Sequence, residues 1–245
     1  MNDKEEMIFL HINDKNDIEE DLIDEYEAEY IFLTEQMNWR KGLKLFKEKC
    51  ETAVTKELQQ IHDMEGFQPK HWHELNADER AKALKYLMYL KEKRNGDVKV
   101  RGCADRRSQR LYKNKQDKAS PTASLAGLII TCVTDAHEKR DVATVDITGA
   151  FLQNKMPKNE DDVHVVLYGK IAELLAKICP DTYQKYVHHK RGQAYIYCKL
   201  NVALYGTLKA AILFWKKLSK SLKEMGLTIN PYDWCITNNI IKGSH

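Results

Sequence analysis

A short apolar run that ends in an acid constrains the fold of this chain more than any other feature. Val142-Ala143-Thr144-Val145 is bounded by charged residues before it and by Gly149 after it, a pattern typical of a central β-strand. Asp146 lies inside this pattern, and burying a carboxylate is costly unless it is paired or holds a cation. The run therefore predicts a strand over 141–147, with Asp146 either satisfied by backbone amides or ligating a metal ion.

Three helical patterns accompany this strand. Apolar residues recur at three- and four-residue steps between Trp39 and Ile61, which predicts a helix with one buried side. A second helix is expected over 120–139, because Ser120-Pro121-Thr122 is a helix start and an apolar stripe follows it. We expect this helix to pack on the strand at 141–147. A third helix, Thr207 to Met225, follows a strand at 197–204 and ends at Gly226.

The segment after the first helix predicts a hairpin. Asn76 to Glu79 fits a capping box that opens a short helix. The residues at 86–90 either continue that helix or begin a strand. Asn95-Gly96 is a strong hairpin signal, so we favour strands over 86–93 and 97–104. Together the elements indicate an α+β fold, with an N-terminal arm at 1–30, a helical lead-in at 31–84 and a main domain at 85–245.

The charges of the chain are divided unevenly. Residues 1–30 hold 12 acidic residues against Lys4 and Lys15, which leaves 37 basic and 24 acidic residues in the rest of the chain. Such a cationic body favours a polyanionic partner. Eight basic residues gather within 20 positions and form either a solvated face or a nucleic-acid contact. They are Lys91, Lys93, Arg94, Lys99, Arg101, Arg106, Arg107 and Arg110.

Other sequence features exclude whole classes of protein. No apolar run approaches the roughly 20 residues that span a bilayer, so we expect no membrane anchor. The acidic N-terminus is unlike a signal peptide, and the six widely spaced cysteines indicate reduced thiols. We therefore expect an intracellular protein that is not secreted.

Two histidine pairs are candidate metal ligands. His71-Trp72-His73 has the spacing of a ligand pair, but no Cys or His follows within 20 residues to complete a local site. His188-His189 lies in a cationic run. The simpler interpretation is that Trp72 anchors a surface turn and that neither pair binds metal.

In the string from Ala143 to Leu152, an Asp is followed by small residues and then by Ala-Phe-Leu. This string resembles the first catalytic motif of the reverse transcriptases of copia-type retrotransposons, in which the Asp is borne by a strand. The string from Leu204 to Ala211, with Phe214-Trp215, resembles their second motif, although it has one inserted residue and no Pro. Three shorter matches keep the same order over residues 80–245: Gly102 in the basic strand, Ser120-Pro121-Thr122, and Pro231-Tyr232-Asp233-Trp234.

The resemblance implies a right-hand polymerase, with fingers near 85–118 and 152–200 and palm elsewhere. Asp146 would be the catalytic residue and Mg²⁺ ligand, and RNA template, DNA primer and dNTP would be the partners. The residues implied to bind nucleotide are Ile147, Phe151, Tyr205 and Gly206, with Lys99 or Arg101 at the triphosphate. Arg106, Arg107 and Lys209 are the expected nucleic-acid contacts.

The family's third motif, a hairpin with two adjacent aspartates, is not found after Trp234. Asp161-Asp162 is the only pair of adjacent aspartates beyond Asp146, and no strand pattern precedes it. Two-metal phosphoryl transfer needs several carboxylates. We therefore expect a fold that is incomplete at its C-terminus, a weak or absent Mg²⁺ site and no polymerase activity in this chain. Ile236 to Gly243 is expected to be a strand without its partner.

Three functions remain open at this level. The first is an RNA-directed DNA polymerase domain located in a cytoplasmic particle or the nucleus. The second is a non-catalytic nucleic-acid-binding remnant of such an element. The third, with less support, is a regulatory protein whose acidic arm folds back on its basic body. The oligomeric state is not predicted.

Overall fold

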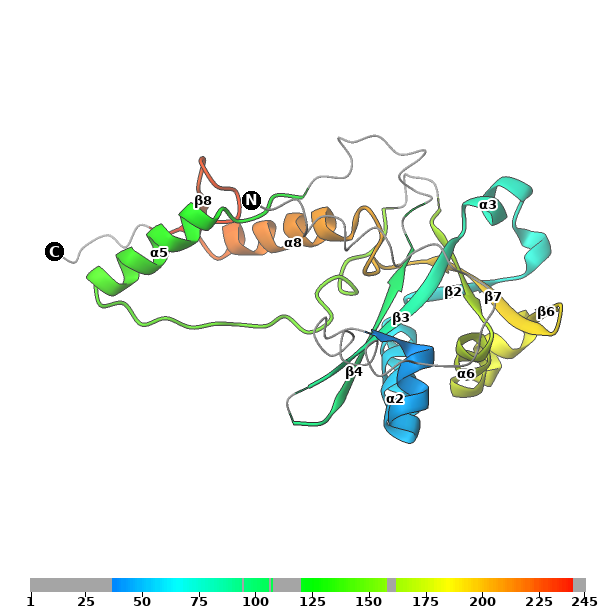
Figure 1. Ribbon diagram of the computed structural model, residues 1–245. Coiled ribbons are helices and arrows are strands. Elements are labelled where there is room, and N and C mark those ends of the chain that lie inside the picture. Colours follow the sequence, from blue (N-terminus) through cyan, green and yellow to red (C-terminus); the bar gives the residue numbers. More distant parts are fainter. Residues whose placement is uncertain (1–36, 94, 106, 108–119, 158–161, 240–245) are drawn as a thin grey trace, which may run out of the picture. The chain divides into compact units, whose positions relative to one another are not determined.

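The computed structural model describes residues 37–93, 95–105, 107, 120–157 and 162–239 of the chain (Figure 1). These residues form a mixed α+β structure, which confirms the predicted class. The acidic arm at 1–30 lies outside the described residues, as do Arg94, Arg106, Arg110 and Asp161.

The described residues contain six α-helices, two short 3₁₀ helices and nine strands. The α-helices are α2 (Trp39–Asp63), α3 (Ala77–Lys82), α5 (Leu125–His137), α6 (Lys170–Ile178), α7 (Pro180–Tyr183) and α8 (Ala210–Glu224). The 3₁₀ helices are η1 (Trp72–Glu74) and η3 (Gln184–Tyr186). The strands are β1 (Met37–Asn38), β2 (Phe67–Lys70), β3 (Leu84–Glu92), β4 (Val98–Ala104), β5 (His164–Tyr168), β6 (His188–Lys190), β7 (Gln193–Leu200), β8 (Thr228–Ile229) and β9 (Thr237–Asn238).

Seven of these strands form one mixed sheet. Its order is β1-β3-β5-β7-β2, with β4 paired to β3 and β6 paired to β7. The β3–β5 pairing is parallel and the other pairings are antiparallel. Side chains alternate across the sheet, so the register decides which residues share a face.

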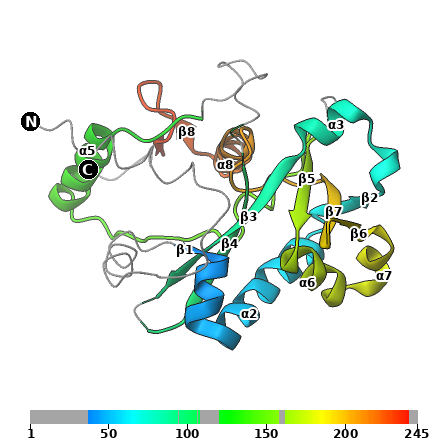
Figure 2. The same ribbon diagram turned by 45° about the vertical axis from the view of Figure 1, so that its right-hand side comes forward.

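Helices α2 and α6 cover one face of this sheet (Figures 1 and 2). The structure confirms the buried side that the sequence predicts for α2, because Cys50, Val54, Leu58 and Ile61 are all buried. They pack with the inward side chains of the strands and of α6 in one core. Because α2 and β2 share this core with later strands, the described part of the helical lead-in, residues 37–84, packs together with the strands that follow it.

The hairpin predicted around Asn95-Gly96 is confirmed. Strands β3 and β4 pair over seven positions, from Glu92 opposite Val98 to Tyr86 opposite Ala104. Gly96 has φ +77°, a left-handed conformation that glycine adopts without steric cost. The capping box at Asn76 and Glu79 is also present and opens α3.

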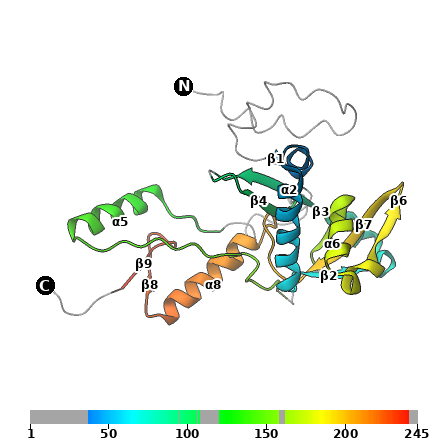
Figure 3. The same ribbon diagram turned by 90° about the horizontal axis from the view of Figure 1, so that it is seen from below.

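The strand predicted over 141–147 is not formed. These residues have no regular secondary structure, and Val142 and Val145 are 72% and 86% exposed. Figure 3 shows the irregular connection that leaves α5 and returns toward α8 and the sheet. A central strand needs a hydrogen-bonded neighbour on each side, and no described strand pairs with this segment.

The helix predicted over 120–139 is present but shorter and differently packed. It begins after Ser124, whose hydroxyl accepts the N–H of Gly127 at 2.9 Å, and ends at His137. The expectation that it packs on a buried strand is wrong, because its apolar stripe is exposed. The predicted stripe consists of Leu125, Leu128, Ile129, Cys132, Val133 and Ala136, all of them exposed, and the neighbouring Ile130 is exposed as well.

The C-terminal predictions are partly confirmed. Helix α8 forms, but its apolar stripe is at best half-buried, and Met225 is 75% exposed. The strand expected from Ile236 onward appears as β9, and its partner is β8, so the expectation of a missing partner is wrong. Residues 240–243 of that expected strand lie outside the described part of the chain.

Candidate nucleotide and nucleic-acid site

Asp146 lies in the irregular connection between α5 and the turn at 148–151, and its side chain is exposed. Ile147, beside it, is 38% exposed. The expected position of Asp146 inside a buried strand is therefore wrong, because none of the described strands pairs with this segment. Among the described residues, no group of three or more His, Cys, Asp or Glu side chains is arranged to hold a metal ion.

Phe151 is placed against the second motif. Its ring centroid lies 4.4 Å from that of Tyr205 and 5.9 Å from that of Phe214 on α8. Gly149, with φ +61°, turns the chain just before Phe151. The two motifs are about 50 residues apart in sequence, and the structure brings their aromatic side chains into contact.

The basic strand β4 also contacts Tyr205 of the second motif. The Arg101 guanidinium lies 5.7 Å from the centroid of the Tyr205 ring. The backbone N–H of Ala104 donates to the Tyr205 carbonyl at 2.7 Å, which ties β4 to the second motif. We call Arg101, Phe151, Tyr205 and Gly206 the Arg101–Tyr205 cluster. All four were implied to bind nucleotide, and they come from three separate segments of the chain.

Gly206 is where the backbones approach most closely. It has φ +86°, and a Cβ built on it would overlap the carbonyl oxygen of Ala104. The sequence resemblance implied that Gly206 lines a nucleotide pocket. The structure adds a second reason for glycine, because any side chain here would force β4 away from the second motif.

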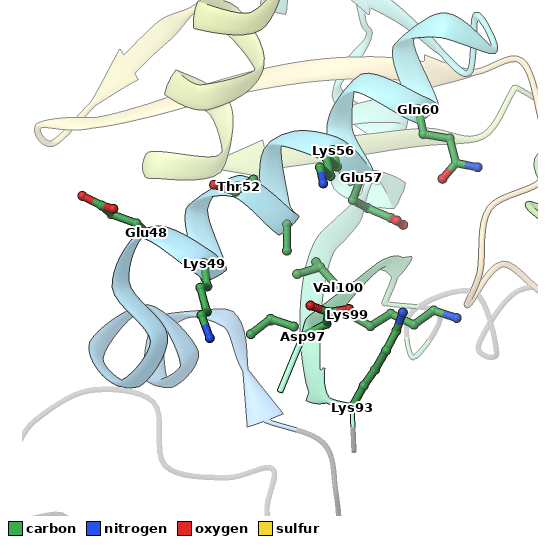
Figure 4. Close-up of a pocket in the computed structure, with 12 residues that line it drawn as sticks. Glu48, Lys49, Thr52, Lys56, Glu57, Gln60, Lys93, Asp97, Lys99 and Val100 are labelled. Carbon is green, nitrogen blue, oxygen red and sulfur yellow. The ribbon is translucent and has the colours of Figure 1, made fainter. Parts of the chain in front are cut away.

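Lys99 lies on a different surface, an open groove of about 640 Å³ between α2 and the β3–β4 hairpin (Figure 4). We call it the hairpin groove. Its lining is mostly charged, with four lysines and three acids. The charged lining residues are Glu48, Lys49, Lys56, Glu57, Lys93, Asp97 and Lys99.

Glu57 is the acid that sequence reasoning missed. Its carboxylate accepts the backbone N–H of Gly102 at 2.9 Å, at a position of β4 that no further strand covers. Burial raises the pKa of this carboxyl, although the Gly102 hydrogen bond and the charges of Arg101 and Lys99 act in the opposite direction. The polar side of the α2 stripe was visible in the sequence, but its contact with β4, 45 residues away, was not.

The other expected nucleic-acid contacts differ in their surroundings. Arg106 lies outside the described residues. Arg107 forms an ion pair with Asp105, with Nη2 to Oδ2 at 2.7 Å, and this hydrogen bonding lowers the pKa of Asp105. Lys209 is half-buried and immediately precedes α8. Of these, Arg107 would have to share its charge between Asp105 and a phosphate.

The segment that follows Ser120-Pro121-Thr122 also contacts the motif Pro231-Tyr232-Asp233-Trp234. Asp233 accepts the backbone N–H of Ser124 at 2.8 Å, which connects the start of α5 to the segment after α8. This hydrogen bond and a second from Cys235 lower the pKa of Asp233. Trp234 stacks on Trp215 at 6.2 Å, and the Trp215 indole donates to the Trp234 carbonyl at 3.1 Å.

The structure also gathers histidines that the sequence keeps apart. The rings of His71 and His73 stack at 5.2 Å, and His188 lies 5.9 Å from His71. Trp72, 46% exposed, lies under the Arg80 guanidinium at 4.1 Å, as expected of a residue that anchors a surface turn. No signal in a single sequence predicts that positions 71 and 188 are neighbours.

Comparisons with known proteins identify no relative, since no family model, curated protein or solved structure matches this chain. Within the part of the chain that the structure describes, none of the helices has the length and apolar character needed to cross a membrane.

Proposed function

We propose that this chain is the fingers and part of the palm of a copia-type reverse transcriptase, and that it binds an RNA template, a DNA primer and dNTP. The observation that carries the proposal is the Arg101–Tyr205 cluster. Motif resemblance alone implied that Arg101, Phe151 and Tyr205 act at one site. Their mutual contacts support that assignment, because neither motif contains any information about the position of the other.

The chemistry of the cluster suits a nucleotide. A guanidinium offers a fork of donors that matches phosphate oxygens, and aromatic rings offer surfaces for a sugar or a base. Lys99, two residues before Arg101 on β4, adds a second basic side chain from the neighbouring hairpin groove. Such a surface would contact the phosphates of a duplex without reading its sequence.

A second candidate function is nucleic-acid binding without catalysis. It is favoured by the position of Asp146, which is exposed on a segment that pairs with none of the described strands. The described residues do not fit a pair of Mg²⁺ ions, since Asp146 has no group of further carboxylates beside it. We therefore derive no metal-dependent step from this structure.

Binding tests the feature that the two functions share. A fluorescently labelled RNA/DNA hybrid of about 20 base pairs is expected to bind the chain, and log Kd is expected to change linearly with log salt concentration. Arg101→Ala and Lys99→Ala should each weaken binding and reduce the salt slope by about 1. Lys177→Ala removes an exposed lysine of α6 that lines neither the hairpin groove nor the Arg101–Tyr205 cluster, and is the matched control.

Catalysis separates the two functions. Primer extension with Mg²⁺ and dNTP is measured on the same hybrid, with Asp146→Asn as the inactive control. Extension that depends on Asp146 would establish the polymerase and contradict the remnant. Binding without extension would establish the remnant. Absence of salt-dependent binding in the first place would refute both.

A further inference from the structure

Six aromatic rings form a continuous row at one end of the sheet. The register places Tyr195 of β7 directly opposite Tyr168 of β5 on one side and His188 of β6 on the other. The corresponding ring centroids lie 6.4 and 5.6 Å apart. We call the following residues the aromatic row: Tyr168, Tyr195, His188, His71, His73 and Tyr186.

The row continues from the sheet onto η1 and η3. His71 lies 5.9 Å from His188, 5.2 Å from His73 and 4.3 Å from Tyr186. The backbone N–H of Trp72 donates to His188 Nε2 at 3.3 Å, which fixes η1 against β6. The position of the rings is therefore held by strand pairing and by this hydrogen bond.

None of these rings is among the buried residues of the core, although Tyr186 packs against the edge of the main core and Tyr195 packs against a smaller cluster that includes Tyr197. On β7, Ala194, Ile196 and Cys198 point toward α2 and α6 and are completely buried, whereas Tyr195 points the other way. Tyr168 is 41% exposed, His73 is exposed, and the remaining rings are half-buried. Exposed rings on neighbouring strands offer flat surfaces to a ligand with rings of its own.

One segment beside the row is basic, although the Glu74 carboxylate lies next to His71 and Lys199 is paired with Asp162 at 2.7 Å. Residues 184–200 include Lys185, Lys190, Arg191 and Lys199 and contain no acid. The Lys185 amino group lies 5.2 Å from the Tyr186 ring centroid. Lys190, at the end of β6, and Arg191, in the turn between β6 and β7, are exposed. A row of rings bordered by cations is complementary to a ligand that alternates bases and phosphates.

We propose that the aromatic row binds single-stranded nucleic acid, whose unpaired bases stack on Tyr168, Tyr195 and His188 while the basic residues at 185–191 contact its phosphates. This goes beyond the proposed function, because none of these residues belongs to the polymerase-like motifs. Stacking is tolerant of sequence, since every base has a π-face. Both single-stranded DNA and single-stranded RNA satisfy this chemistry.

A metal ion is the main competing ligand for three clustered histidines. The His71 and His73 rings are nearly parallel, at 11°, so their nitrogens do not converge on one point. His188 already uses Nε2 to accept the Trp72 N–H. Burial and the neighbouring His71, His73 and His189 lower the pKa of His188, which keeps its ring neutral and suited to stacking at pH 7.

The test is fluorescence anisotropy with labelled 12-nucleotide oligo-dT and oligo-rU, in the presence of EDTA. Tyr195→Ala and Tyr168→Ala should each weaken binding between about fivefold and 150-fold, the range found for loss of one stacking ring. Tyr195→Phe keeps the ring and should bind within about twofold of the wild type. Tyr232→Ala removes a tyrosine that is 97% exposed and outside the row, and should change nothing.

The design distinguishes the possible explanations. Circular dichroism of each variant checks folding, and Tyr195→Phe keeps the test valid if Tyr195→Ala does not fold. Unchanged binding in Tyr168→Ala, or binding that appears only when Zn²⁺ replaces EDTA, would overturn the proposal. Preference for one oligonucleotide identifies DNA or RNA as the ligand. Hybrid binding that depends on Arg101 should survive Tyr195→Ala, so failure of the aromatic row and failure of the proposed function give different results.

Discussion

The contact between Gly206 and β4 leads to a prediction with a built-in control. Gly206→Ala places a Cβ against the Ala104 carbonyl oxygen and 3.0 and 3.1 Å from the Ala104 N and C atoms. All three are backbone atoms, so no side-chain rotation relieves the overlap. To accommodate the methyl group, β4 must move away from Tyr205 and lose the 2.7 Å hydrogen bond from Ala104 to Tyr205.

The expected cost has two parts. A left-handed φ costs a non-glycine residue about 1–2 kcal/mol. Loss of a buried backbone hydrogen bond adds about 1–3 kcal/mol, because its groups are left without partners. The free energy of unfolding should therefore fall by about 2–5 kcal/mol, a large share of the roughly 5–15 kcal/mol of a typical domain.

Gly226→Ala is the matched control. Gly226 has φ +88°, close to the value at Gly206, but no atom lies within 4 Å of its built Cβ. It should lose only the conformational part, about 1–2 kcal/mol. Urea unfolding is followed by far-UV circular dichroism for both variants. Equal losses would refute the argument, because they would mean that the close approach to Ala104 contributes nothing.

Three further predictions concern titratable groups. Tyr86→Phe should raise the free energy of unfolding by about 1 kcal/mol in urea melts, because the buried hydroxyl has no partner among the described residues; a loss of stability would reveal one. Glu57→Gln keeps an acceptor for Gly102 and removes a carboxylate whose pKa burial raises, so its stability gain should be present at pH 7.5 and vanish toward pH 4; a pH-independent gain would contradict this. Burial lowers the pKa of His164, so the folded state binds a proton at this ring less readily than the unfolded state does. The neutral ring therefore has its full stabilising effect above about pH 6.5, and this effect is lost as the pH falls. His164→Gln should therefore show a smaller drop in melting temperature between pH 7.5 and 5.5 than the wild type, and an equal drop would argue against it.

Elements that depend on local patterns were predictable from the sequence. Each of three features depends only on residues a few positions apart in the sequence: the spacing along the α2 stripe, the Asn95-Gly96 turn and the capping box at Asn76. Strand alternation was also readable, since β3 and β4 lie within two residues of the predicted ranges. The chemistry of these segments is nearly sufficient to determine their conformation.

Elements that depend on distant partners were not predictable. Val142 to Val145 has the composition of a buried strand, but composition does not supply the neighbours that would bury it. The packing of α5 was predicted wrongly for the same reason, because its apolar stripe was expected to pack on that strand. The reverse error occurred at His71 and His188, where two unremarkable segments become neighbours through the pairing of β6 with β7 and the Trp72 hydrogen bond.

The two candidate binding surfaces lie on the same face of the sheet but are separated. Lys85 of β3, Val166 of β5 and Tyr197 of β7 are aligned by the strand pairing, so their side chains share one face of the sheet. Alternate residues point the same way, which places Tyr195 and Tyr89 on that face too. Arg101 pairs with Tyr89 and therefore also lies there. This is the face that α2 leaves open. Leu75 and Ala83 cover Val166 and Tyr197 in between.

The residues around η1 and α3 thus divide the open face into two parts. The Arg101–Tyr205 cluster and the aromatic row share no contacting residue among the ring and hydrogen-bond partners described above. Substitutions at well-separated sites without common partners are usually additive. A Tyr195 variant should therefore alter single-strand binding alone, and an Arg101 variant should alter hybrid binding alone. If each variant weakened both ligands equally, the division of this face by η1 and α3 would have no functional meaning, and a single extended surface would be the better description.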